Sequence, residues 1–194
     1  KYKVVVYDFG MKKCQVRSLL SRNCHLIVLP FNTPAKEALS YQPDGIFLSD
    51  GPGDPSSNRE LLNTIEELCQ SKVPILGIGM GHQLLAITNG GQTWKLRHGH
   101  RGANQPVLDY EGQKIITTNQ NHGYAVINES LNLEVGRINL INVNDKTCEG
   151  IRYLPFPGLG VQFQPEPQGT KDDTSFVYDN FMLMMERRVQ GCQG

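Results

Sequence analysis

Short apolar runs alternate with segments of helical period along the first half of the chain. Four runs, at residues 4–7, 26–29, 45–48 and 75–78, have the length and the β-branched content of buried strands. Between the last two runs, apolar residues recur at the spacing of one helix face: Leu61, Leu62, Ile65, Leu68 and Cys69. This alternation predicts an α/β fold with a largely parallel central sheet.

The second half of the chain has a different pattern. A short helix is predicted over residues 82–89, because Gly90 and Gly91 can supply a left-handed C-terminal cap. Several short extended runs then follow between Asn, Gly and Asp turns, which predicts mixed sheet; they include residues 115–117, 138–143 and 160–163.

A last helix is predicted from about residue 174 to residue 188. Asp172 and Asp173 lie near its start, where negative side chains interact favourably with the positive end of the helix dipole. Its apolar stripe consists of Val177, Phe181, Met184 and Met185.

Composition narrows the class of protein. A chain of 194 residues with 39% hydrophobic residues is the size of one globular domain, residues 1–194. Lysine plus arginine equals aspartate plus glutamate at 19 each, which argues against a nucleic-acid binder. No apolar run approaches the roughly 20 residues of a membrane span. The five cysteines lack metal-binding spacing, so we expect a reducing compartment and no metal site; they are Cys14, Cys24, Cys69, Cys148 and Cys192.

Glycine-rich turns follow two predicted strands, and ligands of parallel α/β sheets lie at the strand carboxyl ends. The first turn, residues 49–55, has Gly51 and Gly53, whose backbone can approach a ligand and direct amide hydrogens at it, as in an oxyanion hole. The alternative is a tight loop and helix start shaped only by proline and glycine.

The second turn, residues 77–83, has the strand, sharp turn and helix layout of a nucleophile elbow, G-x-nucleophile-x-G. Its reactive position is Gly79, which has no side chain and forms no covalent intermediate. A phosphate-binding turn is the alternative. It is disfavoured because the acidic partner expected about 20 residues further on is missing.

A third motif, the polar stretch at residues 161–166, ends another strand. Together with the earlier motifs, it makes the chain resemble the glutaminase domain of carbamoyl phosphate synthetase small subunits, which are class I glutamine amidotransferases. Six ordered segments carry the resemblance over about the whole chain: 8–10, 51–55, 77–83, 100–107, 120–126 and 161–166. The resemblance implies a flavodoxin-like fold, with a mostly parallel central sheet flanked by helices and a smaller mixed or antiparallel sheet. It also implies an amino-terminal domain that this chain does not include.

The resemblance implies a catalytic triad of cysteine, histidine and glutamate. The cysteine position is Gly79, the histidine position is Gln164, and only Glu166 is retained. A glutamine side chain has no nitrogen that titrates near neutral pH, so Gln164 is no general base. His82 and His122 also match the family, which keeps both beside an intact triad, and we interpret them as structural.

The glutamine-binding positions of the family are present. They are Gly51, Gly53, Met80, Gln83, Asn121, Gly123 and Tyr124. Met80 replaces a leucine, a small change for a backbone amide contact. The alternative is that these residues only shape turns.

The resemblance leads to one main functional hypothesis, a degenerate glutaminase domain that scaffolds or regulates an ammonia-using carbamoyl phosphate synthetase. One alternative is a glutamine-hydrolysing subunit with engineered or unusual residues at Gly79 and Gln164. Another is a sensor that binds glutamine without cleaving it. The implied partner is a synthetase large subunit or fused synthetase domains, with ATP and Mg²⁺ on that partner and no cofactor in this domain. The implied location is the cytoplasm, or the mitochondrial matrix, and the pathway is that of arginine or of pyrimidines.

Overall fold

The computed structural model describes residues 1–166 and 174–191. In the first half, strands and helices alternate: β1 (Tyr2–Asp8), α1 (Lys13–Leu20), β2 (Cys24–Pro30), α2 (Ala35–Ser40), β3 (Gly45–Leu48), the 3-10 turn η1 (Pro55–Ser57), α3 (Arg59–Gln70), β4 (Ile75–Ile78) and α4 (Met80–Thr88). The second half is mostly strand: β5 (Thr93–Asp109), β6 (Lys114–Val126), the 3-10 turn η2 (Asn128–Ser130), β7 (Gly136–Asn142), β8 (Cys148–Tyr153), β9 (Gly158–Val161) and finally α5 (Phe176–Gly191).

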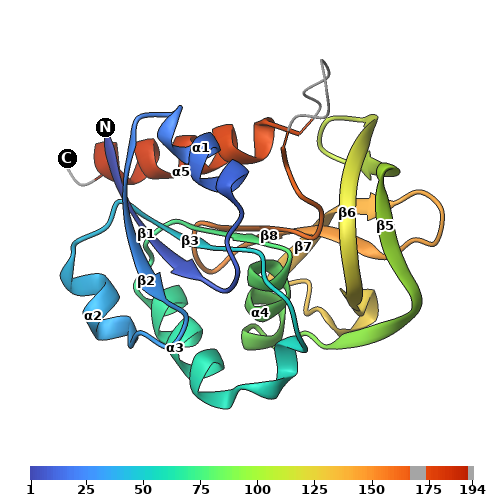
Figure 1. The fold of residues 1–194 in the computed structure, drawn as a ribbon, viewed down its shortest axis with the longest axis horizontal. Helices are drawn as coiled ribbons and strands as arrows, with labels where there is room; N and C mark the ends of the chain where they lie inside the picture. Colours follow the sequence, from blue (N-terminus) through green and yellow to red (C-terminus); the bar gives the residue numbers. More distant parts are fainter. Residues whose placement is uncertain (167–173, 192–194) are drawn as a thin grey trace.

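Within the described part of the chain, nine strands form one mixed sheet in the order β2-β1-β3-β4-β9-β8-β7-β5-β6 (Figure 1). The five strands from β2 to β9 are parallel, in the flavodoxin-like order. The remaining pairs, from β9 to β6, are antiparallel. The smaller sheet expected from the resemblance is therefore not separate, because β8 pairs with β9 on one side and with β7 on the other.

Helices cover both faces of the parallel part of the sheet. In Figure 1, α1 and α5 lie on one side of it and α2, α3 and α4 lie on the other. Side chains alternate across β3 as a strand requires, so Ile46 and Leu48 pack in the core under α2 to α4. Phe47 faces the opposite core and stacks on Tyr178 of α5 at 6.4 Å between ring centroids.

The four predicted strands and the helices α3, α4 and α5 are confirmed, with bounds that differ by a few residues. The C-terminal cap of α4 is also confirmed. Gly90 has φ +87°, and the Gly91 amide donates to the Ala86 carbonyl at 2.8 Å. The helix α5 begins at Phe176, and Asp172 and Asp173 lie outside the described residues.

Several elements were not predicted. The helices α1 and α2 have only eight and six residues, and α1 buries Gln15 beside Leu19, so neither shows a clear apolar period. The predicted runs at residues 138–143 and 160–163 overlap β7 and β9, whereas the run at 115–117 is a small part of a long β5–β6 hairpin that was not predicted. The register of this hairpin shifts at two bulges. The bulges break the two-residue alternation that indicates a strand.

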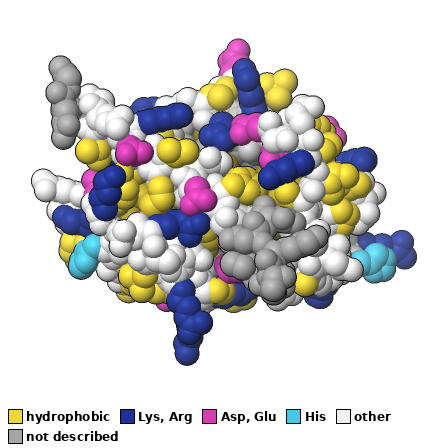
Figure 2. All heavy atoms as spheres, turned by 90° about the horizontal axis from the view of Figure 1, so that it is seen from above, with side chains coloured by type: hydrophobic (Ala, Val, Ile, Leu, Met, Phe, Trp, Pro, Cys, Tyr) yellow, Lys and Arg dark blue, Asp and Glu magenta, His cyan; other side chains and the backbone are white. Residues whose placement is uncertain are grey.

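Charges of both signs are interspersed on the face that α1 and α5 form, as Figure 2 shows. This mixture agrees with the equal numbers of acidic and basic residues in the sequence. Among the described residues, none of the helices has both the length and the apolar character needed to cross a bilayer.

The packing of Phe47 generates a stability prediction. Its side chain is fully buried between the sheet and α5, so Phe47→Ala is expected to lower the free energy of unfolding by about 3–5 kcal/mol. The control is Leu133→Ala, at a side chain that is 75% exposed, with an expected change within about 0.5 kcal/mol. Urea denaturation measures both, and equal losses in the two variants would contradict the assignment of Phe47 to the core.

Candidate functional site

The sharp turn between β4 and α4 is built around Gly79. Its backbone has φ +54° and ψ −106°, a conformation that favours glycine, and its amide donates to the Val161 carbonyl at 2.9 Å. The flanking glycines permit close packing. A Cβ on Gly77 would lie 2.6 Å from the Gly81 carbonyl oxygen, and one on Gly81 would lie 2.3 Å from that of Leu48. The geometry is the strand-to-helix elbow that the sequence predicted.

The space above Gly79 is filled by the carboxylate of Asp50, which follows β3. A Cβ added to Gly79 would lie 2.1 Å from Asp50 Oδ1. This oxygen accepts hydrogen bonds from the Gly51 amide at 2.8 Å and from the Met80 amide at 3.4 Å. Asp50 was not predicted as a site residue, because in the sequence it counts only as part of the loop. Its place after the strand that pairs with β4 is the signal that could have found it.

The two other predicted catalytic positions point in different directions. Gln164 pairs with Asn119 through the backbone, and its side-chain nitrogen donates to Asp50 Oδ2 at 3.4 Å. Glu166 instead lines a cavity of about 380 Å³ together with Cys14 and other residues of α1 and α5. Burial raises the pKa of the Glu166 carboxyl. Gly79 and Gln164 therefore both lie against Asp50, whereas Glu166 faces the cavity beside α1 and α5.

All seven residues that the resemblance assigns to glutamine binding line one pocket of about 110 Å³: Gly51, Gly53, Met80, Gln83, Asn121, Gly123 and Tyr124. Asp50, Pro52, His122 and Gln162 complete its wall. The Gln83 side-chain nitrogen donates to the Tyr124 carbonyl and to Gln162 Oε1, both at 2.8 Å, which holds the two halves of the pocket together. The volume is well below the ~300–1,000 Å³ of usual ligand pockets.

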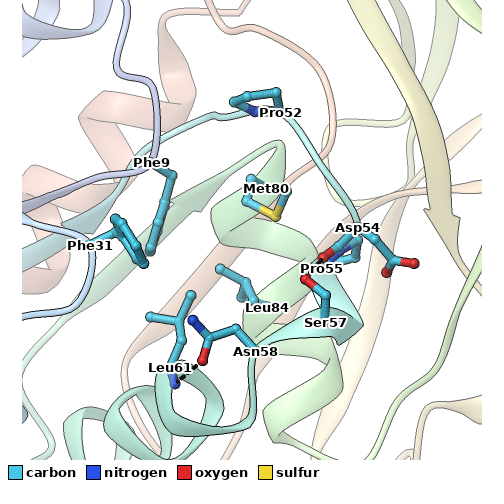
Figure 3. A pocket seen from close by; sticks show the side chains of 10 residues that line it. All are labelled: Phe9, Phe31, Pro52, Asp54, Pro55, Ser57, Asn58, Leu61, Met80 and Leu84. Carbon is cyan, nitrogen blue, oxygen red and sulfur yellow. Dashed lines mark hydrogen bonds between the residues drawn. The ribbon is translucent and has the colours of Figure 1, made fainter.

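A second pocket of about 220 Å³ shares Pro52 and Met80 with the first. Figure 3 shows Met80 among apolar side chains that include Phe9, Phe31 and Leu84. Asp54 is its single titratable residue. Because Met80 is its single residue among the predicted binding positions, whereas the smaller pocket contains all seven, we take the smaller pocket as the candidate site.

His82 is fully buried beneath the elbow. An added Cβ on Gly160 of β9 would lie 2.6 Å from His82 Nδ1, so the ring packs directly on that strand. Burial, with a smaller contribution from His122, lowers the pKa of His82 to about 3 and keeps the ring neutral. This environment suits a structural residue and not a general base.

His100, His122 and Glu149 are the group within the described residues whose side chains could hold a metal ion, with ligand atoms within 4.8 Å of one another. All four ring nitrogens already have protein partners. His100 contacts Asp145 at 2.8 Å and Gln120 at 3.1 Å. The partners of His122 are the same Gln120 side chain at 2.7 Å and a backbone carbonyl at 2.8 Å. We interpret the group as a polar network that joins β5, β6 and β8.

The sequence and fold place the chain in a family. The model of the class-I glutamine amidotransferase family matches residues 5–184, so the chain belongs to the class-I glutamine amidotransferases. Among its relatives, the carbamoyl phosphate synthase small chain of Methanocaldococcus jannaschii is 45% identical over 188 residues, which are 97% of this chain and 52% of that one. The small chain of Lactococcus lactis subsp. cremoris is also 45% identical, over 95% of this chain and 51% of that one. The chain thus spans about half the length of these relatives.

A solved structure shares the fold. A putative GMP synthase protein of Thermoplasma acidophilum superposes with a TM-score of 0.85, covering 99% of this chain and 98% of that one. Its sequence identity is 22%, so the likeness concerns the fold alone.

The network around His100 generates a pH prediction. The Glu149 carboxylate, with Asp145, raises the pKa of His100 from 6.5 to about 9 despite burial. The resulting stabilisation is fully present below pH 6.5 and is lost as the pH rises through 9. His100→Gln is therefore expected to flatten the fall in the free energy of unfolding between these pH values. His98→Gln, at an exposed histidine of the same strand, is the control and should keep the fall. An unchanged fall in His100→Gln would contradict the assignment.

Proposed function

We propose that this domain is a degenerate glutaminase domain of a carbamoyl phosphate synthetase, and a structural or regulatory partner of a synthetase part that uses free ammonia. The observation that carries the proposal is the elbow itself, where glycine and a neighbouring carboxylate occupy the place of a nucleophile. The relatives named carbamoyl phosphate synthase small chain support the choice of partner, a large subunit or fused synthetase domains that bind ATP and Mg²⁺. The cytoplasm or the mitochondrial matrix would suit such a partner.

The described cysteines do not supply the missing nucleophile. Burial raises the pKa of every one of these thiols: Cys14, Cys24, Cys69 and Cys148. The pKa of Cys69 is raised to about 12. Each is therefore protonated at neutral pH, whereas a nucleophilic cysteine is a thiolate or has a base beside it. Cys14 has the Glu166 carboxyl beside it, but the two line a different cavity from the pocket at the elbow. Gln164, at the base position, has no nitrogen that can take the thiol proton.

The glutamine sensor is the second candidate, because all seven glutamine-binding positions line one pocket. Its small volume and the Asp50 carboxylate in its wall count against this candidate. The hydrolysing amidotransferase requires a nucleophile and a base that neither Gly79 nor Gln164 provides, so we rank it last.

The proposal predicts the nitrogen source of the complex. Mixed with a carbamoyl phosphate synthetase large chain, the protein is expected to support carbamoyl phosphate formation from ammonium chloride and MgATP, with no formation from glutamine. Ammonia release from glutamine should stay at the solvent rate, because the nucleophile and its base are both absent. Coupled assays of ammonia and of carbamoyl phosphate measure the two outcomes.

A set of cysteine variants controls this experiment. Each cysteine is replaced by alanine in turn, so that turnover that depends on one thiol is separated from turnover that depends on none. Glutamine turnover above the solvent rate that persists in all the variants of purified protein would contradict the proposal. So would turnover that one replacement abolishes, since it would identify a working nucleophile.

A further inference from the structure

The contacts of Asp50 involve the backbone amides that define an oxyanion hole. In a nucleophile elbow, the hole consists of the amide of the residue after the nucleophile and an amide from a neighbouring loop. Here these are the amides of Met80 and Gly51, and both donate to Asp50 Oδ1, at 3.4 and 2.8 Å. One carboxylate oxygen of the chain therefore lies where the oxygen of an acyl group would lie.

We propose that Asp50 is an internal ligand of the oxyanion hole that excludes glutamine and other amides from the pocket. This inference deepens the proposed function and rests on it, because it identifies the residue that separates a scaffold from a glutamine sensor. A charged oxygen is a stronger acceptor than the neutral carbonyl oxygen of an amide. A bound amide would have to displace it from both donors.

Further contacts hold the carboxylate in place. Lys12 Nζ of the segment before α1 lies 3.4 Å from Asp50 Oδ2, and the Gln164 side-chain nitrogen lies at the same distance. The Asp50 side chain is 18% exposed, so solvent screens these contacts less than it screens a surface pair. Gln164, at the position of the family's general base, thus helps to hold the Asp50 carboxylate in the oxyanion hole.

Asp50 in this position requires glycine at the elbow. An added Cβ at Gly79 would lie 2.1 Å from Oδ1 and 2.7 Å from Cγ of Asp50, closer than nonbonded atoms approach. A nucleophile at the elbow and a carboxylate in the hole therefore exclude each other. A thiol restored at position 79 therefore has to displace the carboxylate from this place unless Asp50 also changes.

The first experiment is isothermal titration calorimetry with L-glutamine. Asp50→Ala removes the carboxylate and Asp50→Asn removes its charge at nearly constant shape. Asp179→Asn neutralises an exposed carboxylate on α5 and is the matched control. We expect the parent and the control to show no binding at millimolar glutamine. Asp50→Ala should bind at least about tenfold more tightly than the parent, and Asp50→Asn should gain less.

Circular dichroism and thermal melts confirm that each variant is folded. If Asp50→Ala fails to fold, Lys12→Gln is used instead, because it weakens the hold on the carboxylate without altering the pocket wall. Lys12→Gln is expected to raise the affinity for glutamine by a smaller factor than Asp50→Ala. Equal glutamine affinity in the parent and in folded Asp50→Ala overturns the inference. Because the proposed function is tested separately by ammonia release, it stands or falls independently of this result.

The second experiment restores the chemistry. The double variant Gly79→Cys, Gln164→His is compared with a triple variant that also carries Asp50→Ala. Removing the carboxylate, which competes with the new thiol and with the bound amide for the same place, is expected to raise the glutaminase rate about 100-fold over that of the double variant. Alkylation of the thiol introduced at position 79, followed by mass spectrometry, should likewise be faster in the triple variant. A double variant that matches the triple variant in both measurements would show that Asp50 does not obstruct the hole.

Discussion

The parallel pairing of β3, β4 and β9 is the constraint on which the site depends. In this register Leu48 lies beside Gly77, and Ile78 lies beside Val161, so the three carboxyl ends lie at one edge of the sheet. The residues that follow the strands are thereby brought together, although they are far apart in the sequence. Asp50, Gly79 and Gln164 meet because each leaves one of these strands within a few residues of its end.

Close packing at this edge leaves little room for alternative arrangements. The glycines on both sides of the elbow press backbone against backbone, and β3 contacts the first turn of α4 without an intervening side chain. Because the backbones lie this close, the side chain at one position limits which side chain fits at the position next to it in space. The Asp50 carboxylate and a side chain at position 79 compete for the same volume, so the glycine at the elbow and the position of the Asp50 side chain depend on each other.

The antiparallel half of the sheet closes the pocket from the other side. The β5–β6 hairpin supplies Asn121, Gly123 and Tyr124, and the network around His100 and Glu149 ties it to β8. The wall of the pocket therefore depends on the contact between His100 and the buried Glu149 as well as on the parallel core. None of the contacts of this framework needs a cysteine at position 79 or an imidazole at position 164.

The sequence by itself determined the features that depend on local pattern. Strand-sized apolar runs predicted the parallel core, Gly90 marked the end of α4, and the glycines around Gly79 predicted the sharp turn. That position 79 has no side chain and position 164 no titratable base also follows from the sequence, because it concerns side-chain identity. Tertiary structure alone decided that β4 and β9 are continuous with the antiparallel strands, that Gln164 reaches Asp50, and that Glu166 lines another cavity beside Cys14. It also decided the contacts of Asp50. These contacts join loops separated by about 30 and by more than 100 residues, and no local period records a distance across a sheet edge.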